Sequence, residues 1–272
     1  MYAPLSSSVT SLRSWIVCGD GIKMPAMYVL KSMAQNALLG LAPVRRYAAA
    51  RHVTGIDGDP RRARELFAFY QRHGDCRGKD VLELGPGKTL DVLRIARHEG
   101  GAKSVAAADV TRYLAESSAA RDGIDYRIYD GGVLPFADAS KDLVWACYCM
   151  QHFRWPELSV QEIARVLRPG GRLVCRVDLR DHYHMFDAGR QYECLKYSAA
   201  LWRLMAWNRS SYVNRLRLSE WRRLLAQVAL KEVELIKHQD RALLQQNRRH
   251  AYLSQYSDDD LLTYRFDGVF EK

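Results

Sequence analysis

The glycine-rich turn after residue 84 could hold either an anion or a nucleoside. It lies in "DVLELGPGKTLDVLRIAR", which begins at Asp80 and joins an apolar run to an amphipathic segment. A phosphate-binding P-loop needs a glycine six residues before its lysine, because its long loop wraps backbone N–H groups around a phosphate chain. Counting back from Lys88 reaches Leu82, inside the apolar run. The turn is too short for a P-loop and is typical of a Rossmann-type strand, turn and helix.

Acidic residues follow the apolar runs in an order that suits a nucleoside with a polar tail. Glu83 and the Gly85/Gly87 turn end the first run, Asp109 ends the second, and Asp130 ends the third. A carboxylate after the second strand can accept hydrogen bonds from both ribose hydroxyls, and one after the third can reach an adenine amino group. Glycines let the rest of a cofactor lie directly on the backbone. Taken singly, each aspartate could be a helix cap or a turn residue, but the ordered set favours a pocket.

These residues need a parallel sheet to bring them together. Strand and helix signals alternate from residue 80 to about residue 178, and apolar strands in such an order imply a parallel sheet with helices on both faces. Ligands of such sheets bind beyond the carboxyl ends of the strands. We therefore predict an α/β fold: a Rossmann-like, mostly parallel seven-stranded sheet with helices on both faces, an N-terminal helical extension and an insertion after the fifth strand. The flanking elements are a helix over 59–74, a helix over 218–230, and strands within 231–238 and 261–272.

The succession of motifs between Lys79 and Asp178 resembles a known family. "VLELGPG", "AADVTRYL", "YDGGVLPFADASKDLVWACYCMQHF" and "EIARVLRPGGRLV" follow one another there. This order resembles the class I S-adenosylmethionine-dependent methyltransferases, in particular the small-molecule group called type 11. The resemblance implies S-adenosyl-L-methionine as the cofactor and methyl transfer to a small-molecule acceptor as the activity.

The resemblance also implies roles for individual residues. One departure is Thr89, which stands where the family usually has a third glycine. A threonine hydroxyl can cap free N–H groups at a helix start, so we expect cofactor binding to be preserved. The implied cofactor-binding residues are Glu83, Gly85, Pro86 and Gly87 around the methionine part, Asp109 and Val110 at the ribose, Asp130 and Gly131 beside adenine, and Cys147 near the sulfonium.

Two histidines are candidate catalytic residues. Methyl transfer needs an aligned nucleophile and, when the acceptor must lose a proton, a general base. His152 follows the fourth strand, close to the expected methyl donor, and histidine titrates near neutrality. It could instead only shape the pocket. His182, in "VDLRDHYHMFD" after the fifth strand, is the second candidate, as a base or an acceptor contact. His182 and His184 could also be metal ligands, but their spacing in an irregular loop is a weak signal, and we predict no metal.

The segments outside the core are predicted to cover the acceptor. We divide the chain into an N-terminal helical extension, 1–75, and a methyltransferase domain, 76–272, with 182–218 as a substrate-side insertion. Aromatic residues at helical spacing in this insertion are predicted to be core residues: Tyr192, Tyr197, Trp202 and Trp207. Its arginines, Arg209, Arg215 and Arg217, are expected to bind a phosphate or carboxylate of the acceptor; the alternative is a solvated basic face.

Composition bounds the remaining properties. The 272 residues, 48% of them hydrophobic, can form a substantial core. The net charge of +10 suits an anionic small molecule, a membrane surface or RNA, so peripheral membrane contact stays open. "SMAQNALLGLAPV" is too short to cross a bilayer, and no secretory signal stands out. The six cysteines contain no C-x-x-C pair; Cys147 and Cys149 should share one face of a strand and, with Cys175, belong to a reduced core. A cytoplasmic location fits best, and the oligomeric state is not indicated.

Two other functions compete with small-molecule methylation. The positive charge motivates an RNA methyltransferase. Against it, the sequence has no added RNA-binding module, and "CYCM" stands where an N-P-P-Y tetrapeptide would grip a flipped-out base. Nucleic acid is therefore an unlikely partner. The third candidate is a catalytically inactive scaffold that binds the cofactor and acts through protein contacts.

Overall fold

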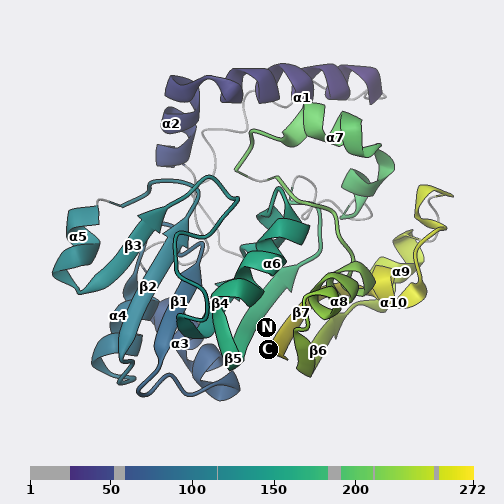
Figure 1. Cartoon of the computed structure of the whole chain (residues 1–272). Helices are drawn as coiled ribbons and strands as arrows, with labels where there is room; N and C mark the ends of the chain where they lie inside the picture. Colours follow the sequence, from purple (N-terminus) through teal and green to yellow (C-terminus); the bar gives the residue numbers. More distant parts are fainter. Residues whose placement is uncertain (1–24, 52–58, 115, 183–190, 211, 248–250) are drawn as a thin grey trace.

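The protein contains one seven-stranded sheet, and its order confirms the predicted Rossmann-like fold. The computed structural model describes residues 25–51, 59–114, 116–182, 191–210, 212–247 and 251–272 (Figure 1). The strand order is β3-β2-β1-β4-β5-β7-β6; β1 to β5 are parallel, and β7 runs antiparallel to both of its neighbours. The strands are β1 (Asp80–Leu84), β2 (Ser104–Asp109), β3 (Ile124–Ile128), β4 (Lys141–Cys147), β5 (Leu167–Asp178), β6 (Lys231–Gln239) and β7 (Thr263–Glu271).

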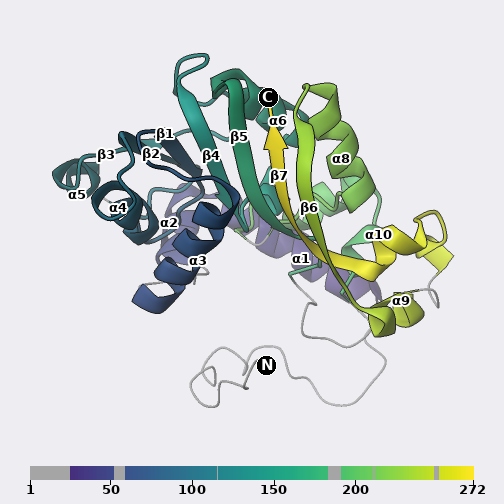
Figure 2. The ribbon, with the colours of Figure 1, turned by 90° about the horizontal axis from the view of Figure 1, so that it is seen from below.

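Helices cover both faces of the sheet, which explains why the central strands are mostly apolar. All five residues of β1 are buried, as expected for a strand covered on both sides. Figure 2 shows α3 and α4 on one side of the sheet and α8 on the other. One apolar core packs α6 (Pro156–Val166) and α8 (Leu218–Gln227) on the first face. The other core packs α3 (Pro60–His73), α4 (Asp91–His98) and α5 (Glu116–Arg121) on the second face.

The chain order creates a crevice between β1 and β4. From β1 the chain proceeds outward through β2 and β3, and it then returns to start the other half of the sheet at β4. Neighbouring connections leave β1 and β4 on opposite faces of such a sheet, and ligands bind at this point, outside the carboxyl ends of the strands. The glycine turn after β1 and the "CYCMQHF" turn after β4 therefore lie side by side.

The helix before the sheet has the ends that its sequence predicts. The side chain of Asp59 accepts a hydrogen bond from the Arg61 N–H, Pro60 occupies the first turn, and Gly74 follows the last turn. These are the usual signals of a helix start and stop. The helix packs an apolar stripe, including Leu66, on the face of the sheet over β1 and β4.

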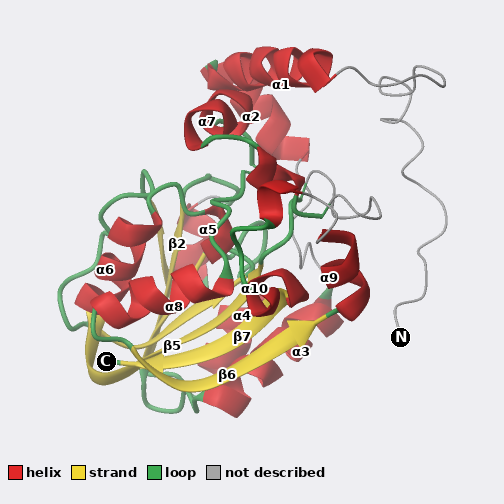
Figure 3. Cartoon of the chain, turned by 90° about the vertical axis from the view of Figure 1, so that its right-hand side faces the viewer, coloured by secondary structure: helices red, strands yellow, loops and turns green. Residues whose placement is uncertain are grey.

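Three further helices form a layer beyond the carboxyl edge of the sheet (Figures 1 and 3). They are α1 (Pro25–Gly40), α2 (Ala42–Arg51) and α7 (Ala199–Ala206). The Asn36 side chain joins α1 to α7, because its amide donates to the carbonyl oxygens of Arg203 and Leu204 at 3.3 and 2.9 Å. A third apolar core lies here and contains Tyr192 and Trp202, with Tyr197 and Trp207 packed against it. The prediction that these aromatic residues belong to a core is confirmed.

Several short elements were not predicted. Between β6 and β7 the chain forms α9 (Arg241–Asn247), the 3-10 helix η4 (Ala251–Leu253) and α10 (Asp258–Leu262). Pro169-Gly170-Gly171 lies inside β5, where the register with β4 shifts, rather than before the strand. No described helix has the length and apolarity that a membrane-spanning segment needs. The remaining 3-10 helices are η2 (Met150–His152) and η3 (Glu193–Lys196).

Candidate functional site

The glycine turn leaves no room for a P-loop. Leu82 is buried inside β1, paired with Ala106 of β2 and Val144 of β4, so the turn begins only after Leu84. Gly85 and Gly87 both have positive φ angles, 64° and 71°, which side chains disfavour. A Cβ atom on Gly85 would lie 2.7 Å from the Cβ of Cys149. The first glycine therefore allows the turns after β1 and β4 to touch.

Thr89 has the role expected of it at the helix start. Its hydroxyl accepts a hydrogen bond from the Asp91 N–H at 3.1 Å, although the N-cap position itself is Leu90. The departure from the usual third glycine thus supports the first turn of α4.

A buried carboxyl group without a partner lies directly below the turn. Glu83 is 3% exposed, and its Oε2 atom has no hydrogen-bond partner among the described residues. Burial raises the pKa of Glu83 to about 8. The residue paired with it on β4 is Trp145, which stacks on Tyr70 of α3 with ring centroids 4.4 Å apart. Leaving a buried polar atom unsatisfied usually costs about 1–3 kcal/mol, so this carboxyl is a natural contact for a polar ligand group.

Asp109 connects the end of β2 to the same turn. Its Oδ2 atom accepts a hydrogen bond from the Gly87 N–H at 3.2 Å, and its Oδ1 atom accepts one from the Thr111 N–H at 2.9 Å. Burial raises the pKa of Asp109 to about 6, and these backbone donors oppose the rise. The structure therefore brings together two of the residues predicted from separate motifs, and Pro86 is buried between the two glycines of the turn.

The loop after β3 lies close to two exposed apolar side chains near this carboxylate. Gly131 has φ 92°, and a Cβ atom on it would lie 3.5 Å from Val110 and 3.4 Å from the ring of Trp155. Val110 and Trp155 are 46% and 42% exposed, which is unusual for apolar side chains so close together. Asp130 is exposed beside them, and its Oδ1 atom accepts a hydrogen bond from the Gly132 N–H. The two apolar side chains and the neighbouring carboxylate suit a flat ring with a polar edge.

The expectation that Cys147 and Cys149 share a face is wrong. Cys147 packs with the core under α3 and α4, whereas Cys149 packs with the opposite core and touches Gly85. The reason is Tyr148, whose φ of 55° breaks the strand alternation just after β4. Cys149 therefore contacts the glycine turn. The position of Cys147 near the sulfonium stays a prediction. Cys175 is buried in the core, as predicted.

The two candidate catalytic histidines lie next to each other. The rings of His152 and His182 are 5.0 Å apart, centroid to centroid, in an edge-to-face arrangement. The Nδ1 atom of His152 lies 2.6 Å from the carbonyl oxygen of Tyr212. A carbonyl can only accept, so Nδ1 carries the proton, and Nε2 is the basic nitrogen of the neutral ring.

The end of the insertion holds the turn that carries His152. The Asn214 N–H donates to the carbonyl of Gln151 at 2.8 Å, and the Asn214 side chain donates to the carbonyls of Met150 and Phe153. Gln151 was not predicted as a site residue. Its side chain is 2% exposed, and neither amide atom has a partner within the described part of the chain. A polar residue in an otherwise apolar turn was the sequence signal for it.

Comparison with known proteins identifies the core that these residues belong to. Residues 82–175 match the family model described as "Methyltransferase domain". This segment is a class I methyltransferase domain. Methyltransferase GfsG of Streptomyces halstedii is 35% identical over 112 residues, which are 39% of this chain and 40% of that protein. The ubiquinone/menaquinone biosynthesis C-methyltransferase UbiE of Desulfotalea psychrophila is 31% identical over 133 residues, 48% of this chain and 52% of that protein.

The likeness to solved structures extends over more of the chain. An S-adenosylmethionine dependent methyltransferase from Mesorhizobium loti superposes with a TM-score of 0.52 at 18% identity, covering 80% of this chain and all of that one. At this identity the likeness shows the fold. The sequence matches, in contrast, span about half or less of the curated relatives. S-adenosylmethionine is the cofactor of the family to which the methyltransferase domain belongs.

The carboxylates near His182 bind groups of the protein itself. Asp178 pairs with Arg180 at 2.6 Å, and the Oδ2 atom of Asp181 accepts a hydrogen bond from the Cys194 N–H. His184 lies outside the described residues. Within the ranges that the structure describes, no three histidine, cysteine or acidic side chains gather as metal ligands.

Two of the three arginines expected at the acceptor bind the protein instead. Arg217 is fully buried, donates to the carbonyls of Leu179, Asp260 and Thr263, and stacks on a tyrosine ring. Arg215 donates to two backbone carbonyls. The expectation of acceptor contacts is therefore wrong for both. Their guanidinium groups instead donate hydrogen bonds to backbone carbonyls at irregular turns.

Arg209 does line a cavity, together with an arginine that was not predicted. The cavity of about 450 Å³ lies between α1, α2 and the loops of the methyltransferase domain. Arg154 is half-buried there, donates its Nε–H to the Trp207 carbonyl, and forms no ion pair with a described residue. Burial lowers the pKa of Arg154, and nearby Arg45 lowers it further. The other described residues that line the cavity are Gln35, Leu38, Leu39, Val44, Arg45, Ala48, Thr111, Tyr113, Asn208 and Ser210.

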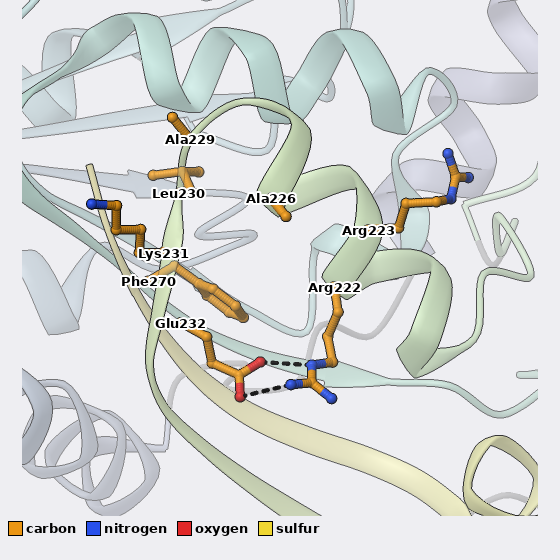
Figure 4. A pocket seen from close by; sticks show the side chains of 8 residues that line it. All are labelled: Arg222, Arg223, Ala226, Ala229, Leu230, Lys231, Glu232 and Phe270. Carbon is orange, nitrogen blue, oxygen red and sulfur yellow. Dashed lines mark hydrogen bonds and ion pairs between the residues drawn. The ribbon is translucent and has the colours of Figure 1, made fainter.

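A second cavity lies at the opposite edge of the sheet. It has about 510 Å³ and lies between α8 and the start of β6 (Figure 4). Arg222 and Glu232 form a bidentate ion pair at its rim, with the shorter contact at 2.7 Å. Because Lys231 and Phe270 stand at the ends of β6 and β7 remote from the crevice, this cavity is separate from the glycine turn.

Proposed function

We propose that the chain transfers a methyl group from S-adenosylmethionine to a small-molecule acceptor. The observation that carries this proposal is the group of carboxyls around the glycine turn. Glu83 precedes the turn, Asp109 is hydrogen-bonded to it, and Asp130 stands next to Gly131. When bound, S-adenosylmethionine supplies an electrophilic methyl group on a sulfonium. The relative named UbiE is a C-methyltransferase of quinone biosynthesis, which supports a small-molecule acceptor without indicating its atom.

The residues suit this cofactor chemically. The partnerless Oε2 atom of Glu83 can accept a hydrogen bond from an ammonium group once the carboxyl ionises. Asp109 presents two oxygens to vicinal hydroxyls, with its orientation held by the Gly87 and Thr111 N–H groups. Val110 and Trp155 offer apolar surfaces on either side of Gly131 for a purine ring.

On the acceptor side we assign the proton transfer to His152. Its Nδ1 hydrogen bond to Tyr212 holds the ring and leaves Nε2 as the site that takes up a proton from the acceptor. The buried amide of Gln151 is placed in the same turn to orient a polar acceptor group. His182 packs against the His152 ring, which favours a positioning role over a second base.

We further propose that the acceptor carries a phosphate or carboxylate. The support is the cavity under α1 and α2, where Arg45, Arg154 and Arg209 gather and no acidic side chain stands among the described lining residues. Arg154, a partly desolvated guanidinium that forms no ion pair with a described residue, favours an anion. The cytoplasmic location and the division into an extension, 1–75, and a core, 76–272, remain predictions.

A labelling experiment tests the proposal. Radiolabelled S-adenosylmethionine is incubated with the protein and with neutral metabolites, acidic metabolites or RNA. Label in the acidic fraction, lost in His152→Gln, is the expected result. Label only in RNA would favour the competing substrate class. Cofactor binding without label in any fraction would favour a scaffold.

A further inference from the structure

Helix α1 has apolar residues on both its inner and its outer side. Tyr28, Val29 and Met33 pack on the third apolar core beside buried Ser32 and Asn36, and Asn36 is hydrogen-bonded to the segment that contains α7. The outer side of the helix and the residue after it also carry apolar side chains, spaced by three or eight residues and therefore on one helical face. Their exposed fractions are large: Met27 68%, Leu30 65%, Leu38 56% and, just after the helix, Leu41 55%. We name these four residues the outer stripe.

A surface helix in water normally carries apolar residues only on the side toward the protein. A contiguous exposed apolar surface on a folded protein therefore indicates a contact with something else. The stripe belongs to α1 and the residue after it, and α1 lies beyond the carboxyl edge of the sheet (Figures 1 and 3). No described residue buries these four side chains.

Charge indicates what the stripe contacts. Residues 25–51 contain no aspartate or glutamate, and their four cationic side chains are all exposed. Lys31 borders the stripe, one residue from Leu30, and Arg46 lies on α2 close to exposed Tyr47. Exposed apolar residues flanked by cations are the pattern of a helix that lies in the interface of an anionic membrane. These cations are Lys31, Arg45, Arg46 and Arg51.

We propose that α1 and α2 dock the protein onto an anionic lipid surface through the outer stripe. The stripe enters the headgroup region, and Lys31 and Arg46 pair with lipid phosphates or carboxylates. This proposal does not depend on the proposed methyl transfer. Met27, Leu30, Leu41, Lys31 and Arg46 lie outside the acceptor cavity, whereas Leu38 and Arg45 also line it.

Vesicle flotation with the full chain tests the proposal. The protein should float with phosphatidylcholine vesicles that contain phosphatidylserine, and much less with phosphatidylcholine alone. Removing two cations in Lys31→Gln/Arg46→Gln should weaken partitioning roughly twenty-fivefold, since each contributes about a factor of five. Added salt should weaken it as well. The triple variant Met27→Ser/Leu30→Ser/Leu41→Ser, whose residues all lie outside the acceptor cavity, should lose at least tenfold in partitioning.

A matched control distinguishes the stripe from general stickiness. Val233 and Ile236 of β6 are also exposed apolar residues, so Val233→Ser/Ile236→Ser should float like the wild type. Unchanged melting temperature and cofactor affinity would show that the stripe variant is folded. No flotation of the wild type, or equal flotation of the stripe variant, would overturn the proposal. Light scattering that shows a dimer for the wild type and a monomer for the stripe variant would overturn it too, because a second copy would then cover the stripe.

Discussion

Cofactor binding should depend on pH through Glu83, because this carboxyl must ionise to receive an ammonium group. Burial raises its pKa to about 8, so at pH 7 about one protein in eleven has it ionised. Ionising it there costs about 1.4 kcal/mol, which weakens binding about tenfold relative to a fully ionised site. The affinity for S-adenosylhomocysteine should therefore rise as the pH increases from 6.5 to 8.

Calorimetry at pH 7 can measure the proton directly. Titrations in two buffers that differ in ionisation enthalpy should show nearly one proton released for each S-adenosylhomocysteine bound. The Glu83→Gln side chain cannot ionise. This variant should therefore bind S-adenosylhomocysteine more weakly, release fewer protons on binding and lose most of the pH dependence of its affinity. Asp109, with a pKa of about 6, contributes only below pH 7. An affinity that is flat between pH 6.5 and 8, with no proton released, would refute the assignment of Glu83 as a cofactor contact.

The same residue should make the free protein less stable as pH rises. Because the folded state raises the pKa of Glu83 above its unfolded value, the folded protein keeps a proton that the unfolded chain loses above about pH 4.5. The stability that neutral Glu83 provides is fully present below that pH and is lost progressively up to about pH 8. The melting temperature of Glu83→Gln should match the wild type near pH 5 and exceed it near pH 8. The difference corresponds to roughly 4 kcal/mol at most.

Three further predictions concern separate parts of the site. ATP with magnesium should leave the melting temperature unchanged, since Leu82 stands where a P-loop needs glycine, and stabilisation that Lys88→Ala abolishes would contradict this. His152→Gln should lower kcat roughly 10²–10⁴-fold with cofactor affinity intact; a change in KM alone would leave it only a pocket-shaping role. Arg154→Gln should raise KM for an acidic acceptor about tenfold or more, as expected for a charge-assisted hydrogen bond, without changing cofactor affinity. Arg222→Gln, whose guanidinium pairs with Glu232 at the opposite edge of the sheet, is the matched control and should behave like the wild type.

The parts of the fold with strong local signals were predictable. The buried strand β1 is apolar except for Asp80 and Glu83, and α3 is bounded by Asp59 and Gly74, so periodicity and capping located both. The helices α9 and α10 have seven and five residues, too few for an apolar period to appear. Their existence depends on packing between distant segments, which local sequence does not encode.

Site residues were predictable where their position at the end of a strand decides what they contact. They were less predictable where a side chain could meet either the protein or a ligand. Asp109 reaches Gly87 because both stand at the carboxyl edge of the sheet. Cys149 was misplaced because the left-handed backbone of Tyr148 interrupts the strand alternation. Arg217 and Arg154 have the same chemistry, but one meets three backbone carbonyls and the other a cavity. Charge alone cannot distinguish these surroundings.

Calorimetric titration of S-adenosylhomocysteine into the wild type and Asp109→Ala tests the central claim most directly. The wild type should bind one molecule. Loss of a buried, charge-assisted acceptor should cost about 1.5–3 kcal/mol, so the variant should bind at least tenfold more weakly. Circular dichroism should show that the variant is folded. Absence of binding by the wild type, or an unchanged affinity in a folded Asp109→Ala variant, would contradict the cofactor site described for this methyltransferase domain.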